Sequence, residues 1–260
     1  MTVAKWSTAL AVVTLALLVP RSAPADLGLD VSPAKYEMEI PAGQSQTVPI
    51  TVRNTGADTV HIQVSLVDFT VGANGQYQFL LPGKNKYSMA PWVSLNPREF
   101  DIQPNTLTQV RVSVTVPAAA TGEHSVIAFF QTRPTRKPGG VSFSERIAAK
   151  LYELVPNTLQ LSGEVDDLSA RPSPDGERYL VGFKNTGNAH VYLNGRIEIK
   201  QGSTVVERIE LPKQMLVERG GERIVDVEGK KLGPGSYTAI ALIDYGGPNL
   251  TGGEKTFTVR

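Results

Sequence analysis

The stretch that decides the fold of this chain runs from Gly122 to Pro156, GEHSVIAFFQTRPTRKPGGVSFSERIAAKLYELVP. It predicts two strands joined by a basic loop rich in proline and glycine. The first strand is the apolar run from Ser125 to Phe130, whose β-branched and aromatic residues favour a place in a sandwich core. In the second strand apolar and polar residues alternate, which puts the two sets on opposite faces. The apolar set is Val141, Phe143, Ile147, Ala149 and Leu151.

The same alternation appears along the rest of the chain. It is clearest in residues 110–116, where valines alternate with Arg111, Ser113 and Thr115. Turn signals such as Asn74-Gly75 separate these segments, and no segment shows a helical period of useful length. Many short strands divided by proline and glycine indicate an all-β fold. We therefore predict two tandem immunoglobulin-like β-sandwich domains.

The first 25 residues are typical of a secretory signal peptide. An apolar run from Ala9 to Val19 precedes the small-residue signature Ala23-Pro24-Ala25, which predicts cleavage before Asp26. The alternative is an uncleaved anchor, although a membrane span needs roughly 20 apolar residues. The predicted parts are a signal peptide at 1–25, a first sandwich at 26–156 and a second at 157–260. The mature chain should be periplasmic or extracellular, with no membrane span.

Composition narrows the classes of partner. The chain has no cysteine, so neither domain can contain a disulfide, although export would permit one. Its formal net charge is +1 and no large charged block is present, which gives no electrostatic reason to expect nucleic acid. The short basic loop around Arg133, Arg136 and Lys137 lacks interleaved aromatic residues and is interpreted as solvated surface.

The two halves share a local pattern. A strand ends in a basic residue followed by Asn-Thr-Gly at Asn54 and again at Asn185. Asparagine and glycine tolerate the positive φ of tight turns, so the repeat supports a shared fold rather than a shared ligand. His61 and His190 each follow such a turn, which favours a role in the fold over a role as ligands.

A search for reactive groups predicts that the protein is not an enzyme and holds no cofactor or metal. The three histidines lie far apart in sequence, and no nucleophile elbow, phosphate loop or dinucleotide fingerprint is present. The acidic pair Asp166-Asp167 lacks the regular spacing of a calcium loop and is interpreted as solvated. Asn249-Leu250-Thr251 fits the glycosylation pattern only as a short motif.

The first domain resembles the PapD-like periplasmic pilus-assembly chaperones from about Leu29 to Pro156. The resemblance rests on several short motifs: Ser32-Pro33, Ile50–Thr55, Trp92-Val93-Ser94, Phe100-Asp101-Ile102, Gly122-Glu123-His124, Ile127–Phe130 and Ala149–Tyr152. The family fold is two immunoglobulin-like domains in an L shape. Its members use the last strand of the first domain to complete the incomplete sandwich of a pilin subunit.

The resemblance also implies a binding site. Two basic residues in the family's interdomain cleft hold the subunit's C-terminal carboxylate, and Lys150 falls on the second of them. For the first, Lys35 is the candidate, although strict register places Met38 there. Val141–Leu151 would supply the strand, with Val141, Phe143, Ile147 and Ala149 as its alternating apolar row and Glu145 interrupting that row.

The leading hypothesis is therefore an exported, non-enzymatic chaperone that binds an extended segment of an envelope protein subunit by strand addition. The alternative is a structural or adhesive cell-envelope protein that binds a surface partner or wall polymer through loops. A hydrolase whose site the sequence does not reveal is the third. A chaperone should expose Phe143 and Ile147 on an edge, whereas a plain sandwich buries both.

Overall fold

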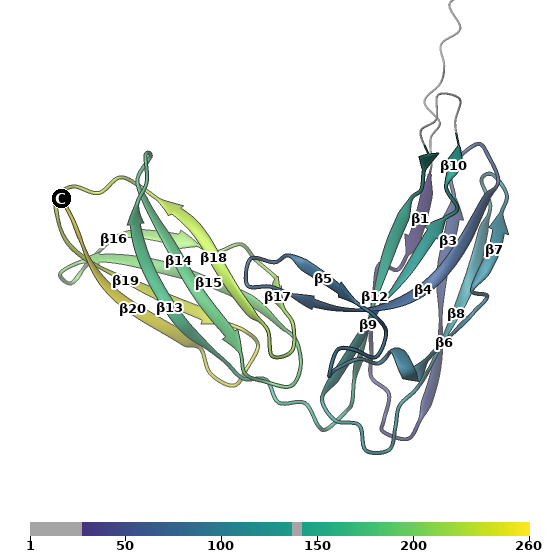
Figure 1. The fold of residues 1–260 in the computed structure, drawn as a ribbon. Helices are drawn as coiled ribbons and strands as arrows, with labels where there is room; N and C mark the ends of the chain where they lie inside the picture. The colour runs from purple at the N-terminus through teal and green to yellow at the C-terminus, as the bar shows by residue number, and fades with distance from the viewer. Residues whose placement is uncertain (1–27, 137–141) are drawn as a thin grey trace, which may run out of the picture.

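The computed structural model of the protein describes residues 28–136 and 142–260, and the predicted signal peptide lies outside this range. The described chain forms two β-sandwiches set at an angle, which gives the molecule an L shape (Figure 1). The predicted all-β class with two sandwiches is confirmed. Pro156 lies between the last strand of the first sandwich and the first strand of the second.

The first sandwich is built from two main sheets. One has the order β1-β3-β8-β6, and the other has the order β2-β12-β9-β4-β5 with β7 paired to β4, while β10 and β11 form a separate hairpin. The strands are β1 (Leu29–Ser32), β2 (Lys35–Met38), β3 (Ser45–Asn54), β4 (Val60–Val71), β5 (Tyr77–Leu80), β6 (Val93–Asn96), β7 (Glu99–Ile102), β8 (Leu107–Thr115), β9 (Glu123–Thr132), β10 (Thr135–Arg136), β11 (Ser142–Phe143) and β12 (Arg146–Leu154).

A short 3-10 helix, η1 (Ala90–Trp92), precedes β6. Pro91 lies in this helical turn, and the strand begins at Val93. No helix in the described residues has the length and apolar character of a membrane span.

The second sandwich also has two sheets. One has the order β13-β14-β18, and the other has the order β16-β15-β19-β20 with β17 paired to β15. The strands are β13 (Gly163–Pro172), β14 (Glu177–Asn185), β15 (Val191–Gln201), β16 (Thr204–Glu210), β17 (Met215–Val217), β18 (Glu222–Gly229), β19 (Gly235–Asp244) and β20 (Thr251–Val259).

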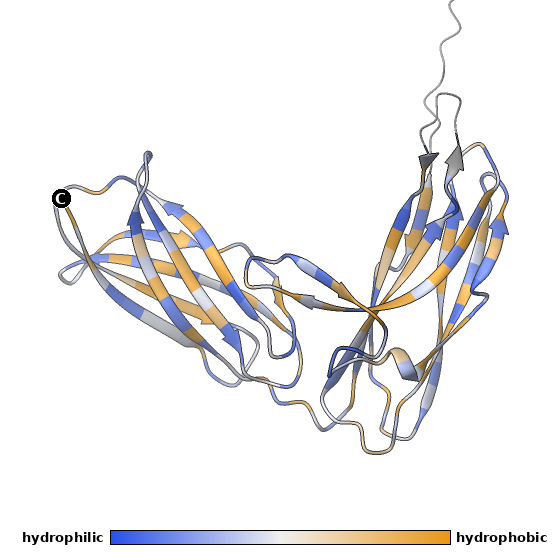
Figure 2. Ribbon diagram, viewed as in Figure 1, coloured by the Kyte–Doolittle hydropathy of each residue, from blue (hydrophilic) through white to orange (hydrophobic). Residues whose placement is uncertain are grey.

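Period-two alternation builds both cores. Along β8 the side chains of Val110, Val112 and Val114 are fully buried while their neighbours face solvent or the sheet rim. Figure 2 shows apolar and polar residues alternating along strands of both sandwiches. Strand β9 differs because it is apolar on both faces: Val126, Ala128 and Phe130 join the main core, whereas Ile127 and Phe129 join a smaller cluster on the opposite face.

At Pro33 the chain switches from one sheet of the first sandwich to the other. Strand β1 pairs with β3 in one sheet, and after Pro33 the chain enters β2, which pairs with β12 in the other. Because β1 covers only the end of β3, Pro49 lies where the outer edge of β3 is unpaired. A residue without an N–H is tolerated at such an edge position.

The repeated Asn-Thr-Gly turns have a common structural role. The buried Asn54 amide donates to the carbonyls of Asp58 and Ile102 and accepts from the Gly56 N–H. Asn185 makes the equivalent bonds in the second domain, donating to the carbonyl of Ala189 and accepting from the Gly187 N–H. A buried side-chain amide thus satisfies the backbone groups of each turn, as a tight buried corner requires.

Candidate functional site: the edge of β12 and the interdomain cleft

Strand β12 has one edge that is only partly covered. On one side it pairs with β9 along its whole length, and on the other side β2 runs parallel to it from Lys150 to Glu153 only. The Thr132 N–H donates to the Glu145 carbonyl at 2.9 Å on the β9 side, and the Lys150 N–H donates to the Ala34 carbonyl at 2.9 Å on the other side.

Bonding directions alternate along an antiparallel strand, so Arg146 and Ala148 point their backbone groups the same way as Lys150, away from β9. No strand in the described residues covers these groups, because β2 begins opposite Lys150. We call the outward backbone groups of Arg146 and Ala148 the open edge.

The predicted row of apolar residues does not lie along one exposed surface. Ala149 is fully buried in the core of the first sandwich, and Ile147 is half-buried against the same core. Phe143 is 49% exposed on β11, and Val141 lies outside the described residues. Of the two side chains chosen to separate the hypotheses, one is therefore exposed and one packs inward. Whether these residues bind a partner stays a prediction.

The predicted second strand is also not continuous. It divides into β11 and β12 at Ser144 and Glu145, whose hydroxyl and N–H bond to Thr132 of β9. The Glu145 carboxylate accepts the N–H of Leu29 at 3.2 Å, which ties the start of β1 to this point. The acidic residue that interrupts the apolar row thus has a structural partner in the first strand.

The two predicted basic residues come together in the structure. Lys35 and Lys150 are direct partners in the parallel pairing of β2 with β12, while Met38 is buried in the core. Lys35, and not Met38, is therefore the residue paired with Lys150. Their role in holding a carboxylate stays a prediction.

Each of these lysines already has a carboxylate neighbour. Lys150 donates to Glu218 of the second domain at 3.1 Å and to the Tyr152 hydroxyl at 3.1 Å, and that hydroxyl donates to Glu218 at 2.9 Å. Lys35 bonds to Glu37 at 2.6 Å and to the Tyr192 hydroxyl. A partner carboxylate at Lys150 would have to share or replace Glu218.

A buried ion pair joins the domains beside the lysines. His190, just before β15, donates its backbone N–H to Glu123 of β9 at 2.7 Å, and its Nδ1 lies 2.5 Å from the same carboxylate oxygen. Its Nε2 lies 3.2 Å from Glu37, and its ring packs against Tyr152. The exposed fraction of Glu123 is 1% and that of His190 is 7%.

The charges around the cleft shift several pKa values. Burial lowers the pKa of His190, but its hydrogen bond with Glu123 and the charges of Glu123, Glu37 and Glu218 raise it by more, so the net shift is upward. Burial raises the pKa of Glu37, yet hydrogen bonds from Lys35 and Tyr192 with the charge of His190 hold it below its usual value. The network therefore favours the protonated form of His190 and the ionised form of Glu37.

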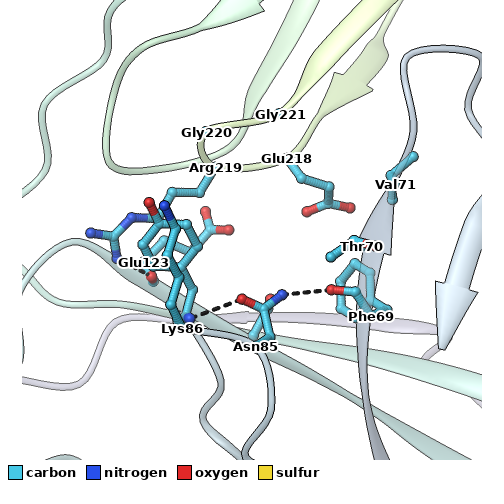
Figure 3. A pocket seen from close by; sticks show the side chains of 12 residues that line it. Phe69, Thr70, Val71, Asn85, Lys86, Glu123, Glu218, Arg219, Gly220 and Gly221 are labelled. Atoms are coloured by element: carbon cyan, nitrogen blue, oxygen red, sulfur yellow. Dashed lines mark hydrogen bonds between the residues drawn. The ribbon is translucent and has the colours of Figure 1, made fainter. Parts of the chain in front are cut away.

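A cavity of about 180 Å³ lies where the domains meet. Figure 3 shows Glu218 and Arg219 of the second domain facing Phe69 and Glu123 of the first. The guanidinium of Arg219 donates to the Glu123 carbonyl at 2.5 Å and stacks on the Tyr87 ring at 4.0 Å. These contacts add a second polar link across the cleft.

The β4–β5 hairpin forms a third link. It reaches toward the second sandwich (Figure 1), where the carbonyl of Ala73 accepts the N–H of Ile224 at 2.8 Å. Gly75 has a φ of +80°, as the predicted Asn-Gly turn requires, and a Cβ there would lie 2.1 Å from the guanidinium of Arg223. The turn signal was readable in the sequence, but its contact with another domain was not.

Sequence reasoning missed the second domain's share of the site. Glu218, Arg219 and Tyr192 stand among ordinary surface-type residues, and no motif marks them. No group of three or more metal-ligating side chains occurs in residues 28–136 and 142–260. Arg146 and Phe79, which face the cleft from the first domain, also carry no linear signal.

Comparison with solved structures identifies the fold. A chain of the chaperone–tip adhesin complex of CFA/I fimbriae biogenesis aligns with a TM-score of 0.50 at 12% identity, covering 88% of this chain and 98% of that one. The chain has the PapD-like chaperone fold. Two further PapD-like chaperone structures align less closely. The class 5 fimbrial chaperone CfaA gives a TM-score of 0.49 at 10% identity, over 90% of this chain and 100% of that one.

The second is the CsuC–CsuE chaperone–tip adhesin complex of Acinetobacter baumannii, which gives 0.47 at 14% identity, over 87% and 97% of the two chains. The sequence itself matches no protein-family model and no curated protein. The likeness to the PapD-like fold is therefore one of structure, and it covers both domains.

Proposed function

We propose that this protein is an exported chaperone that binds an extended segment of a pilin-type or other envelope subunit by β-strand addition. The open edge of β12 is the observation that carries the proposal. An extended segment can pair with the outward N–H and C=O groups of Arg146 and Ala148, because main-chain hydrogen bonds supply affinity in this mode of recognition. Uncovered edges otherwise invite uncontrolled pairing.

The position of β2 favours one direction for the added segment. A segment that lies beside β12 and runs parallel to it meets the start of β2 at Lys35. Its terminal carboxylate would then lie near Lys35 and Lys150, where charge-assisted hydrogen bonds can hold it. Glu218 pairs with Lys150 in the free protein, so binding would replace the Glu218 carboxylate at Lys150 with that of the partner.

The chaperone–adhesin complex that shares the fold supports a protein subunit as the class of partner. The predicted signal peptide supports a compartment outside the cytoplasm, and we propose the periplasm. Phe143 extends the proposed contact beyond β12, and Val141 would do so from outside the described residues.

The open edge can be tested by removing one N–H. Ala148→Pro deletes an outward donor without breaking the ladder to β9, and proline is tolerated at such edges. Ala148→Ser is the matched control because it changes the side chain and keeps the N–H. Each variant would be used to capture subunits from envelope extract, with a thermal melt to verify folding and mass spectrometry to identify the captured protein.

We expect the wild type and Ala148→Ser to capture the same subunit, and Ala148→Pro to bind it at least about tenfold more weakly, through one lost hydrogen bond and a steric clash. On binding, the Ala148 amide should become protected from hydrogen exchange. Equal capture by the proline and serine variants would contradict strand addition at this edge. Lys150→Ala separately tests the carboxylate contact.

A further inference from the structure

The cleft face of β12 carries two cations above a strip of aromatic rings. We call the rings of Phe69, Tyr77, Phe79 and Phe129 the aromatic strip. The ring centroids of Phe69 and Tyr77 lie 5.8 Å apart, and those of Tyr77 and Phe79 lie 6.2 Å apart. Those of Phe79 and Phe129 lie 5.2 Å apart. Tyr77 and Phe79 are 41% and 48% exposed, so part of the strip faces solvent.

The two cations above the strip differ in their partners. Lys150 lies 4.7 Å from the Tyr77 ring centroid and is neutralised by Glu218. Arg146 stacks over Phe129 at 4.2 Å and approaches Phe79 at 5.9 Å. No carboxylate in the described residues lies within salt-bridge distance of Arg146, which is exposed. A guanidinium stacked on a ring keeps its in-plane donors available for a second partner.

Arg146 also belongs to the open edge. A residue added directly opposite it would point to the same face, one strand spacing of about 4.7–4.9 Å away. Opposite charges at such positions stabilise strand pairing and like charges weaken it. The neighbouring position on that face is Ala148, whose small side chain leaves room for a bulky apolar partner beside Phe129.

We infer that the segment added to β12 carries an acidic side chain opposite Arg146, and an apolar side chain two residues away opposite Ala148. This inference rests on the proposed function and specifies the sequence pattern of the partner. Glutamate suits the position better than aspartate, because the guanidinium leans over β9, away from the open edge, and the longer side chain reaches it. Any extended segment can form the main-chain hydrogen bonds with β12. The ion pair between Arg146 and the acidic side chain would select among such segments.

The test uses short synthetic peptides of alternating apolar and polar residues with a free C-terminal carboxylate. Each set contains three peptides that differ only in having Glu, Gln or Lys at one position. Successive sets place this variable residue two positions further along the peptide, so that one set brings it opposite Arg146 in whichever register the peptide binds. Binding is measured by fluorescence anisotropy to the wild type and to Arg146→Glu. Arg111→Glu is the control, since Arg111 is exposed on β8 in the other sheet.

At one site in the peptide the wild type should prefer Glu over Lys by about fivefold. Arg146→Glu should reverse that order, and Arg111→Glu should leave it unchanged. If all three peptides bind but no charge preference reverses between the wild type and Arg146→Glu, the inference is overturned and strand addition remains intact. Failure of every peptide to bind, or binding that Ala148→Pro does not weaken, would instead refute the proposed function and the inference with it.

Discussion

The buried pair of Glu123 and His190 should make the junction of the domains sensitive to pH. Glu123 begins β9 and His190 immediately precedes β15. Their charged or titratable neighbours among the described residues include Glu37, Glu218, Lys35, Lys150, Tyr152, Tyr192, Arg219 and His124. Glu123→Gln removes the negative charge while keeping an oxygen that can accept the His190 backbone N–H. The substitution therefore isolates the charge.

The magnitude follows from burial. Removing one partner of a buried ion pair costs about 3–5 kcal/mol, because the other charge is left uncompensated. Glu37 remains 3.2 Å from the His190 ring, so we expect the lower end, about 3 kcal/mol, while His190 is protonated. Once His190 is neutral, only a hydrogen bond of ordinary strength changes, and the expected cost falls to about 1 kcal/mol.

The sign of the pH dependence follows from the direction of the shift. The pKa of His190 is raised in the folded protein above its ordinary value of 6.5. Its contribution to the free energy of unfolding is therefore fully present below pH 6.5, and it is lost as pH rises through the folded pKa. Wild-type stability should fall above pH 6.5, and Glu123→Gln should reduce this fall.

Urea unfolding at pH 5.5 and pH 8.5 gives the comparison. Trp92 fluorescence is a suitable probe because this side chain packs against His124, next to Glu123. His61→Asn serves as the control, since His61 also has carboxylate partners, Asp101 and Glu99, but lies outside the interdomain cleft. A Glu123→Gln cost of about 1 kcal/mol or less at pH 5.5, with no decrease at pH 8.5, would show that His190 is not charged in the folded protein and refute the reasoning.

Three further substitutions test other parts of the structure. Burial, with the charge of Glu39, raises the pKa of Glu153 to about 7 against a hydrogen bond from Ile40. Stability should therefore fall between pH 4.5 and 7, and Glu153→Gln should flatten that part of the urea-derived profile. Asp68→Asn should lower the free energy of unfolding by about 1–3 kcal/mol, because the two buried carboxylate oxygens of Asp68 accept hydrogen bonds from the Asn85 N–H and the Ser88 hydroxyl. As a control, Asp58→Asn at an exposed position should change it by less than about 0.5 kcal/mol. Glu218→Gln should tighten binding of a peptide with a free C-terminal carboxylate by about fivefold, because Glu218 no longer competes for Lys150. The affinity for the amidated peptide should not change, and calorimetry would measure both. Equal changes for the two peptides would contradict competition at Lys150.

The sequence predicted the strands well because burial in a sandwich imposes a period of two. The valines of β8 and the turn at Asn74-Gly75 follow directly from side-chain direction and backbone freedom. Parity also predicted that Ile147 and Ala149 share a face. It did not reveal that this face is the protein's own core, since an exposed and a buried row have the same period.

The site was harder to predict because it depends on pairing between distant segments. Lys150 was found through a resemblance to a family, and Lys35 was named only as one candidate beside Met38. Their adjacency depends on the parallel register of β2 and β12, which a single sequence does not specify. Glu218 and His190 reach the cleft from another domain, and their partners are separated from them by 68 and 67 positions in the chain.

One short segment produces both halves of the proposed site. The chain leaves the first sheet after Ser32 and begins β2 at Lys35. Because β2 starts there and no earlier, β12 stays uncovered at Arg146 and Ala148. The same starting point sets Lys35 opposite Lys150. The length of the crossing at Pro33 therefore fixes where an added strand must stop and which charges it meets. If β2 began two residues earlier, it would cover Ala148 and remove the edge, even with every residue of β12 unchanged.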